Sequence, residues 1–184
     1  MISVEDWALI RRLVADWVPD ARGIPRRRAA RVVLFDPSGR VLLALGHDRH
    51  RPGRHWWFTI GGGVEAGEAP REAACRELRE ETGIRIALDA LEGPVLHRRA
   101  VFDFSEVTAR QEEWFFLART RSTVLDRSGW TADERDVVDG QRWWDLAELA
   151  SEAERTEVFP RELPSLARGW RAGWDGRLVE ISEF

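Results

Sequence analysis

The chain has 184 residues, of which 43% are hydrophobic and 33% charged, and its formal net charge is −4. This composition excludes a disordered chain, and the negative balance gives no general attraction to nucleic acid. The single cysteine excludes an internal disulfide framework, and no apolar run is long enough to cross a bilayer. We therefore expect a cytoplasmic protein without a nucleic-acid or membrane partner.

The N-terminal segment has the pattern of an amphipathic helix. Apolar residues recur at helical spacing between Ser3 and Val18, Ser3 is a suitable N-cap, and Pro19 ends the pattern. We predict a single domain over residues 1–184, in which residues 1–25 form a helical extension packed on the core.

The first half of that core reads as strands followed by a helix. Apolar runs at 30–35 and 40–45 flank the turn sequence Asp-Pro-Ser-Gly and predict a hairpin. A third strand is expected at 56–60, a glycine-rich loop at 61–70 and a helix at 69–82.

The second half of the chain alternates less regularly. Strands are expected at 84–88, 95–104, 112–119 and 142–146, the last of them in the chain. A polar loop is expected from about 120 to 141, with helices from 145 and over 162–170. Strands and helices without regular βαβ alternation predict an α/β or α+β layered domain with a mixed sheet.

Three carboxylates lie close together on the helix at 69–82. Glu77, Glu80 and Glu81 occupy positions i, i+3 and i+4, where Cβ atoms are roughly 5–6 Å apart, while Leu78 belongs to an apolar stripe. Like charges at this spacing repel, and Mg²⁺ or Mn²⁺ bound through carboxylate oxygens would offset the repulsion. A solvated helix face rich in Glu and Arg is the alternative on the helix pattern alone.

The residues before the helix favour the metal. Glycines 61–63 allow the backbone to approach a ligand closely, and Glu68 stands at the helix N-terminus, where negative charge is favoured. Residues 62–84 match the Nudix box at every defined position, so this segment resembles the Nudix hydrolase family. The matching residues are Gly62, Glu68, Arg76, Glu77, Leu78, Glu80, Glu81, Gly83 and Ile84.

The resemblance implies a fold and a reaction. The fold would be an α/β/α sandwich with a mixed sheet between helices. The reaction would be the hydrolysis of a nucleoside diphosphate linked to another group X, with Mg²⁺ or Mn²⁺ as cofactor and water attacking phosphorus. Glu80 and Glu81 would be metal ligands, and Glu77 would be a ligand or the base that deprotonates the attacking water.

The resemblance also assigns roles around these carboxylates. A backbone carbonyl of Gly61 or Gly62 would complete part of the metal shell. Arg76 would orient the glutamates, Glu68 would tie the loop to the helix, and Gly83 would let the chain turn out of the helix.

A further acid comes from a later part of the chain in this family. Four residues are available, and we favour Glu134 among Glu112, Glu113, Glu134 and Asp136. Motifs associated with dinucleoside polyphosphate, ADP-ribose, NADH and coenzyme A substrates are absent, which favours a nucleoside di- or triphosphate. A homodimer would follow the family's habit.

Three residues near the box are candidates for contact with a nucleotide-type substrate. Arg49 and Arg54 could meet phosphates, and Trp57 could stack on a base. An exposed polar loop and packing of the indole in the core are the alternatives. Two other functions occur on the fold that the resemblance implies: a nucleotide-binding or sensing module without turnover, and an isomerase of isoprenoid diphosphates.

Overall fold

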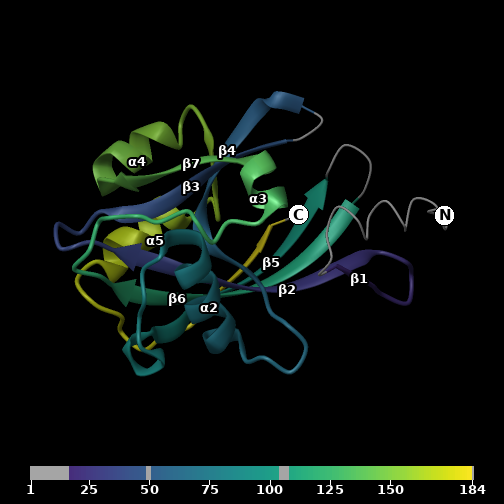
Figure 1. Ribbon diagram of the computed structural model, residues 1–184, viewed down its shortest axis with the longest axis horizontal. Coiled ribbons are helices and arrows are strands. Elements are labelled where there is room, and N and C mark those ends of the chain that lie inside the picture. The colour runs from purple at the N-terminus through teal and green to yellow at the C-terminus, as the bar shows by residue number, and fades with distance from the viewer. Residues whose placement is uncertain (1–16, 49–50, 104–107, 184) are drawn as a thin grey trace.

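The computed structural model describes residues 17–48, 51–103 and 108–183 (Figure 1). The strands are β1 (Val18–Pro19), β2 (Pro25–Phe35), β3 (Val41–Asp48), β4 (Arg51–Gly63), β5 (Glu92–Asp103), β6 (Thr108–Arg119), β7 (Val138–Trp144), β8 (Glu157–Phe159) and β9 (Val179–Glu183). The helices are α2 (Pro70–Thr82), α3 (Ala132–Val137), α4 (Leu146–Glu152) and α5 (Leu163–Trp170), with a 3-10 turn at Leu88–Ala90.

The strands form one mixed sheet. Its order along the main path is β7-β3-β4-β2-β6-β5-β9, with β1 beside β2 and β8 beside β4. β2 and β6 run parallel from the pair Arg26↔Arg110 to the pair Phe35↔Arg119, and β5 runs parallel to β9. The other neighbours on the main path are antiparallel.

Helices cover both faces of this sheet. Ala73, Ala74 and Leu78 of α2 pack with alternate residues of β2, among them Val32 and Leu34, on one face. Leu149 of α4 and Leu163 of α5 pack with Val33 and Phe35 on the other. The expected sandwich with a mixed sheet between helices is confirmed.

β4 joins the two halves of the sheet and delivers the glycines of the box. Its first half pairs with β3 and its second half with β2, from Val32↔Ile60 to Ala29↔Gly63. Gly61 has a φ of 134°, and a Cβ there would lie 2.2 Å from the Ala30 carbonyl oxygen, so only glycine fits. The three glycines thus end a strand, whereas the sequence predicted that they open a loop.

Several expected elements differ from those observed. Strands β2 and β3 are joined by the expected turn but share only the pair Phe35↔Val41, because β4 and β7 take the partner positions along β3. Residues 84–87 have no regular structure and Leu88 opens the 3-10 turn, so no strand forms at 84–88. The loop expected at 120–141 contains α3.

The C-terminal part is richer in strands than its sequence indicated. β7 is not the last strand, because β8 and β9 follow it and pair in parallel with β4 and β5. The helix expected from Ser3 lies outside the described residues up to position 16, and residues 17–25 contain β1 and a turn. No helix in the described ranges has the length and apolar character needed to span a bilayer.

Candidate active site

Helix α2 has clear signals at both ends. Pro70 occupies its first turn, where a missing N–H is harmless, and the Glu72 carboxylate accepts a hydrogen bond from the Ala69 N–H at 2.9 Å. Gly83 ends it in the left-handed conformation, with φ of 73°, and donates to the Arg79 carbonyl. The buried stripe fixes the rotation of the helix, so the carboxylates face the end of β4.

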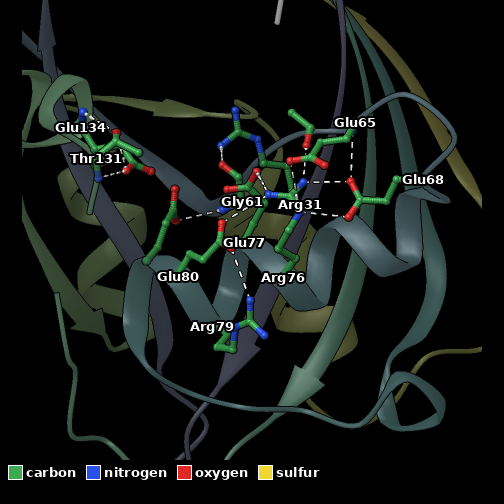
Figure 2. A network of polar contacts seen from close by, with 12 residues as sticks. Arg31, Gly61, Glu65, Glu68, Arg76, Glu77, Arg79, Glu80, Thr131 and Glu134 are labelled. Atoms are coloured by element: carbon green, nitrogen blue, oxygen red, sulfur yellow. Dashed lines mark hydrogen bonds and ion pairs between the residues drawn. The ribbon is translucent and has the colours of Figure 1, made fainter. Parts of the chain in front are cut away.

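Arg76 ties the loop before α2 to the helix (Figure 2). Its Nε and Nη2 donate to the two oxygens of Glu68 at 2.9 and 2.8 Å. Nη2 also donates to the Gly63 carbonyl at 2.8 Å, and Nη1 donates to Glu77 Oε1 at 2.7 Å. A guanidinium held at both ends keeps one oxygen of Glu77 in place.

The end of β4 passes directly over the carboxylates of α2. The Gly61 N–H donates to Glu81 Oε2 at 3.0 Å. A Cβ built on Gly62 would lie 2.5 Å from Glu77 Oε2, so no larger residue fits without moving that carboxylate. The glycines therefore admit the close approach that the sequence predicted.

A third carboxylate joins Glu77 and Glu81 from a distant part of the chain. Glu134, on α3, offers an oxygen that lies within 4.8 Å of one oxygen from each of the other two. Thr131 is the N-cap of α3. Its Oγ1 accepts from the Glu134 N–H, while Glu134 Oε2 accepts from the Thr131 N–H at 2.6 Å. Of the four acids considered for this role, Glu134 is the one that the structure brings to the cluster.

Two side chains that flank α3 attach residues 130–141, here called the α3 segment, to α2. Trp130 Nε1 and Gln141 Nε2 donate to the Glu81 carbonyl oxygen at 2.8 and 3.0 Å. This carbonyl belongs to the last turn of α2, where helix carbonyls lack partners within the helix.

Two expected ligand atoms are engaged elsewhere. Glu80 is 42% exposed and pairs with Arg76 at 3.3 Å and Arg79 at 3.4 Å, outside the cluster of three. The Gly61 carbonyl accepts a hydrogen bond from Arg31 Nη1 at 2.6 Å. Each of these oxygens keeps a further lone pair, so the present contacts do not prevent it from binding a cation.

The electrostatics of the cluster favour a bound cation. Burial, with repulsion from Glu77, raises the pKa of Glu81 to about 8, against partial compensation by Arg31. Burial also raises the pKa of Glu77, although Arg76 opposes the shift. The donor atoms are carboxylate oxygens, which suit a hard divalent cation such as Mg²⁺ or Mn²⁺, and Glu77, Glu81 and Glu134 would hold it.

A cavity of about 510 Å³ lies next to Arg31 and Thr59, although Glu77, Glu81 and Glu134 are not among its lining residues. Arg31 and Thr59 connect it to the end of β4, and Val137 connects it to α3. Its aromatic lining comes from Trp17, Trp56, Phe58, Phe115 and Phe159. A cavity of this size and lining is of the kind that binds small organic ligands.

Of the three residues that the sequence predicted to contact the substrate, one lines the cavity, one packs elsewhere and one is not described. Arg54 lines the cavity and pairs with Glu157 at 3.1 Å. Trp57 packs edge-on against Trp144, with ring centroids 4.9 Å apart, so its neighbour Trp56 is the indole that reaches the cavity. Arg49 lies outside the described residues.

Sequence reasoning missed the residues that support the site from a distance. Arg31, Trp130 and Gln141 have no spacing relation to the box. A single arginine inside the apolar run at 30–35 was the one available signal, because a charge within a buried strand needs a partner.

The structure is an α/β/α sandwich with a cluster of acidic side chains where the end of β4 meets α2. Residues 25–165 match the model of the NUDIX domain, and the chain belongs to this family. An RNA pyrophosphohydrolase of Caulobacter vibrioides is 53% identical over 133 residues, covering 64% of this chain and 70% of that protein. One of Dinoroseobacter shibae is 42% identical over 67 residues, covering 36% and 40%. The chain thus spans less than half of the latter relative's length.

Solved structures show the same fold. A MutT protein from Bacillus halodurans superposes with a TM-score of 0.56 at 20% identity, covering 85% of this chain and 89% of that one. A MutT protein from Methanosarcina mazei gives 0.54 at 18% identity, covering 79% and 93%.

Proposed function

We propose that this protein is a pyrophosphohydrolase that requires Mg²⁺ or Mn²⁺ and cleaves a nucleoside diphosphate linked to another group, with a nucleoside di- or triphosphate as substrate. The observation that carries the proposal is the convergence of Glu77, Glu81 and Glu134 within 4.8 Å, together with a cavity lined by Arg31 and Thr59. Membership of the NUDIX family supports it.

The residues of the site would have separate roles in the reaction. A divalent cation, when bound, neutralises phosphoryl charge and lowers the pKa of water. Arg76 fixes the Glu77 carboxylate, and the Gly61 N–H fixes that of Glu81. Glu81 would be a ligand of the cation, and Glu77 would be a further ligand or the base that accepts a proton from the attacking water. The cavity would hold the nucleoside while the diphosphate lies over the carboxylates.

A second substrate is favoured by the names of the relatives. Both relatives described above are RNA pyrophosphohydrolases. The 5′-triphosphate end of an RNA presents the same phosphoanhydride as a free nucleoside triphosphate. Composition argues against general affinity for nucleic acid, because the net charge is −4, but it does not oppose recognition of an RNA end.

A release assay tests the proposal and separates these substrates. Phosphate and pyrophosphate release would be measured with Mg²⁺ and with Mn²⁺, from nucleoside di- and triphosphates, ADP-ribose and a 5′-triphosphorylated RNA oligonucleotide. Wild type should hydrolyse at least one of them, and Glu81→Gln should lose about 100-fold or more. Glu154→Gln, which removes an exposed carboxylate, is the matched control.

Two results would contradict the proposal in different ways. Tight nucleotide binding without metal and without turnover would indicate a binding module. Turnover that is unchanged in Glu81→Gln would refute the assigned carboxylate site but leave the activity standing.

A further inference from the structure

Arg31 lines the cavity and also contacts Gly61, the residue that lies against the carboxylate cluster (Figure 2). Its Nη1 donates to the carbonyl oxygens of Thr59 and Gly61 at 3.2 and 2.6 Å. Gly61 in turn donates its N–H to Glu81. Gly61 therefore lies between the Arg31 guanidinium and the carboxylate of Glu81, and Arg31 also forms part of the cavity wall.

A buried network holds this guanidinium in a single position. Arg31 Nε donates to Glu113 Oε1 at 2.9 Å, and the Gln111 amide donates to the same oxygen at 2.6 Å. Arg98 Nη1 donates to Glu113 Oε2 at 2.5 Å. Burial opposes the charge of Glu113, but Arg31 and Arg98 hold its pKa below the ordinary value, so the network stays ionised.

The network leaves one edge of Arg31 available. A guanidinium has five N–H donors. Nε uses its donor on Glu113, and Nη1 points its donors at the carbonyls of Thr59 and Gly61. Within the part of the chain that the structure describes, Nη2 makes no hydrogen bond. The side chain is 13% exposed and lines the cavity, and Nη2 is not among the buried polar atoms without a partner, so a ligand in the cavity can reach this edge.

Arg54 and Arg161 also line the cavity but lie further from the carboxylate cluster. Arg54 and Arg161 both pair with Glu157, at 3.1 and 3.5 Å. They lie beside β8, whereas Arg31 alone among these three contacts the glycine strand above the carboxylates.

We propose that Arg31 is a substrate-binding residue, which donates through Nη2 to a non-bridging oxygen of the diphosphate held between the carboxylate cluster and the cavity. The proposal rests on the proposed function. A planar donor that is already fixed by Glu113 loses little freedom when it binds phosphate, and arginine is suited to such contacts.

The test measures binding, separately from turnover. Calorimetry would follow binding of methylenediphosphonate, a non-hydrolysable diphosphate, in the presence of Mg²⁺. Mn²⁺ binding without any phosphate would be measured by electron paramagnetic resonance. The variants are Arg31→Gln and Arg31→Lys, with Arg142→Gln as control, because Arg142 pairs with Glu148 outside the site. Thermal unfolding would verify that each variant is folded.

We expect Arg31→Gln to weaken diphosphate binding about 10-fold or more, the loss typical of one hydrogen bond to a charged group. Arg31→Lys should recover part of the loss, since it restores charge but not the planar fork. Mn²⁺ affinity should change far less than diphosphate affinity in both variants. The control should bind both ligands like wild type.

Three outcomes would overturn the inference. Unchanged diphosphate affinity in Arg31→Gln would refute the contact. An equal loss of Mn²⁺ and diphosphate affinity would show that Arg31 acts only by holding Gly61 and Glu81. Wild type that neither binds the diphosphate nor hydrolyses any tested substrate would refute the proposed function together with this inference, whereas the first two results leave that function intact.

Discussion

Glu81 is the residue on which the contacts of the candidate site are concentrated. Its carboxylate is held by the Gly61 N–H, and its backbone carbonyl receives Trp130 and Gln141. Burial and the neighbouring Glu77 raise its pKa from the ordinary 4.5 to about 8. The fold thus keeps a proton on this carboxylate until a cation replaces it.

The raised pKa predicts how stability depends on pH in metal-free protein. Between about 4.5 and about 8 the folded state binds more protons at Glu81 than the unfolded state does. The free energy of unfolding should therefore fall as pH rises through this interval and level off above it. Urea unfolding in EDTA from pH 5 to 9 would show a smaller decline for Glu81→Gln. Equal slopes for this variant and wild type would contradict the assigned pKa.

Glu134 provides a prediction about metal affinity. In Glu134→Gln the amide oxygen can still accept the hydrogen bond from Thr131, because glutamine also serves in a capping box, but the charge is lost. We expect Mn²⁺ to bind about 10-fold more weakly or worse, with thermal stability nearly unchanged. Glu154→Gln should bind Mn²⁺ like wild type. Retention of full affinity in Glu134→Gln would remove Glu134 from the ligand set.

At the scale of elements, the site forms where the end of β4 crosses α2. Most of this junction could be predicted from sequence, because Gly62, Glu68 and Glu77 belong to one contiguous motif with a fixed spacing. The contributions of Arg31 and Trp130 could not, because sheet pairing and loop docking bring them in from distant positions. The strand predicted at 84–88 failed because its apolar residues Ile84 and Ile86 pack beside α2 without strand pairing.

The close approach of β4 and α2 can be tested with glycine variants. Gly62→Ala would place a methyl group against the Glu77 carboxylate, 2.5 Å from Oε2, so that this carboxylate must move. We expect activity and Mn²⁺ affinity to fall about 10-fold or more. Gly169→Ala on α5 meets no neighbour within 4 Å and should raise stability by about 0.5–1 kcal/mol with activity retained. Normal Mn²⁺ affinity in Gly62→Ala would contradict the direct contact between β4 and α2.

Across the whole molecule, the sheet separates two apolar layers with different tasks. The layer under α2 supports the carboxylates, whereas the layer under α4 and α5 contains Leu149 and Leu163 and touches none of them. This arrangement follows from the alternation of side chains along β2 and β3. The layered fold could be predicted from the resemblance of the motif to the family. Strands β8 and β9 could not, since strands of three and five residues give little periodic signal.

The two layers predict separable effects of core truncation. Leu149→Ala and Leu78→Ala both remove fully buried side chains, and each should cost about 2–5 kcal/mol of unfolding free energy. Only Leu78→Ala should also weaken Mn²⁺ binding, because Leu78 lies on α2 next to Glu77. Urea unfolding and Mn²⁺ titration of the two variants would decide this. Equal loss of Mn²⁺ affinity in both would show that the sheet transmits the disturbance.

The attachment of the α3 segment to the last turn of α2 has a consequence for the order of assembly. Glu77 and Glu81 come together as soon as α2 forms, because one helical turn separates them. Glu134 arrives only when Trp130 and Gln141 reach the Glu81 carbonyl, 49 and 60 residues further along the chain. The proposed cation site is therefore complete only in a chain whose Trp130 and Gln141 have docked on the end of α2, so tight Mn²⁺ binding would report on the tertiary structure and not on the helix alone.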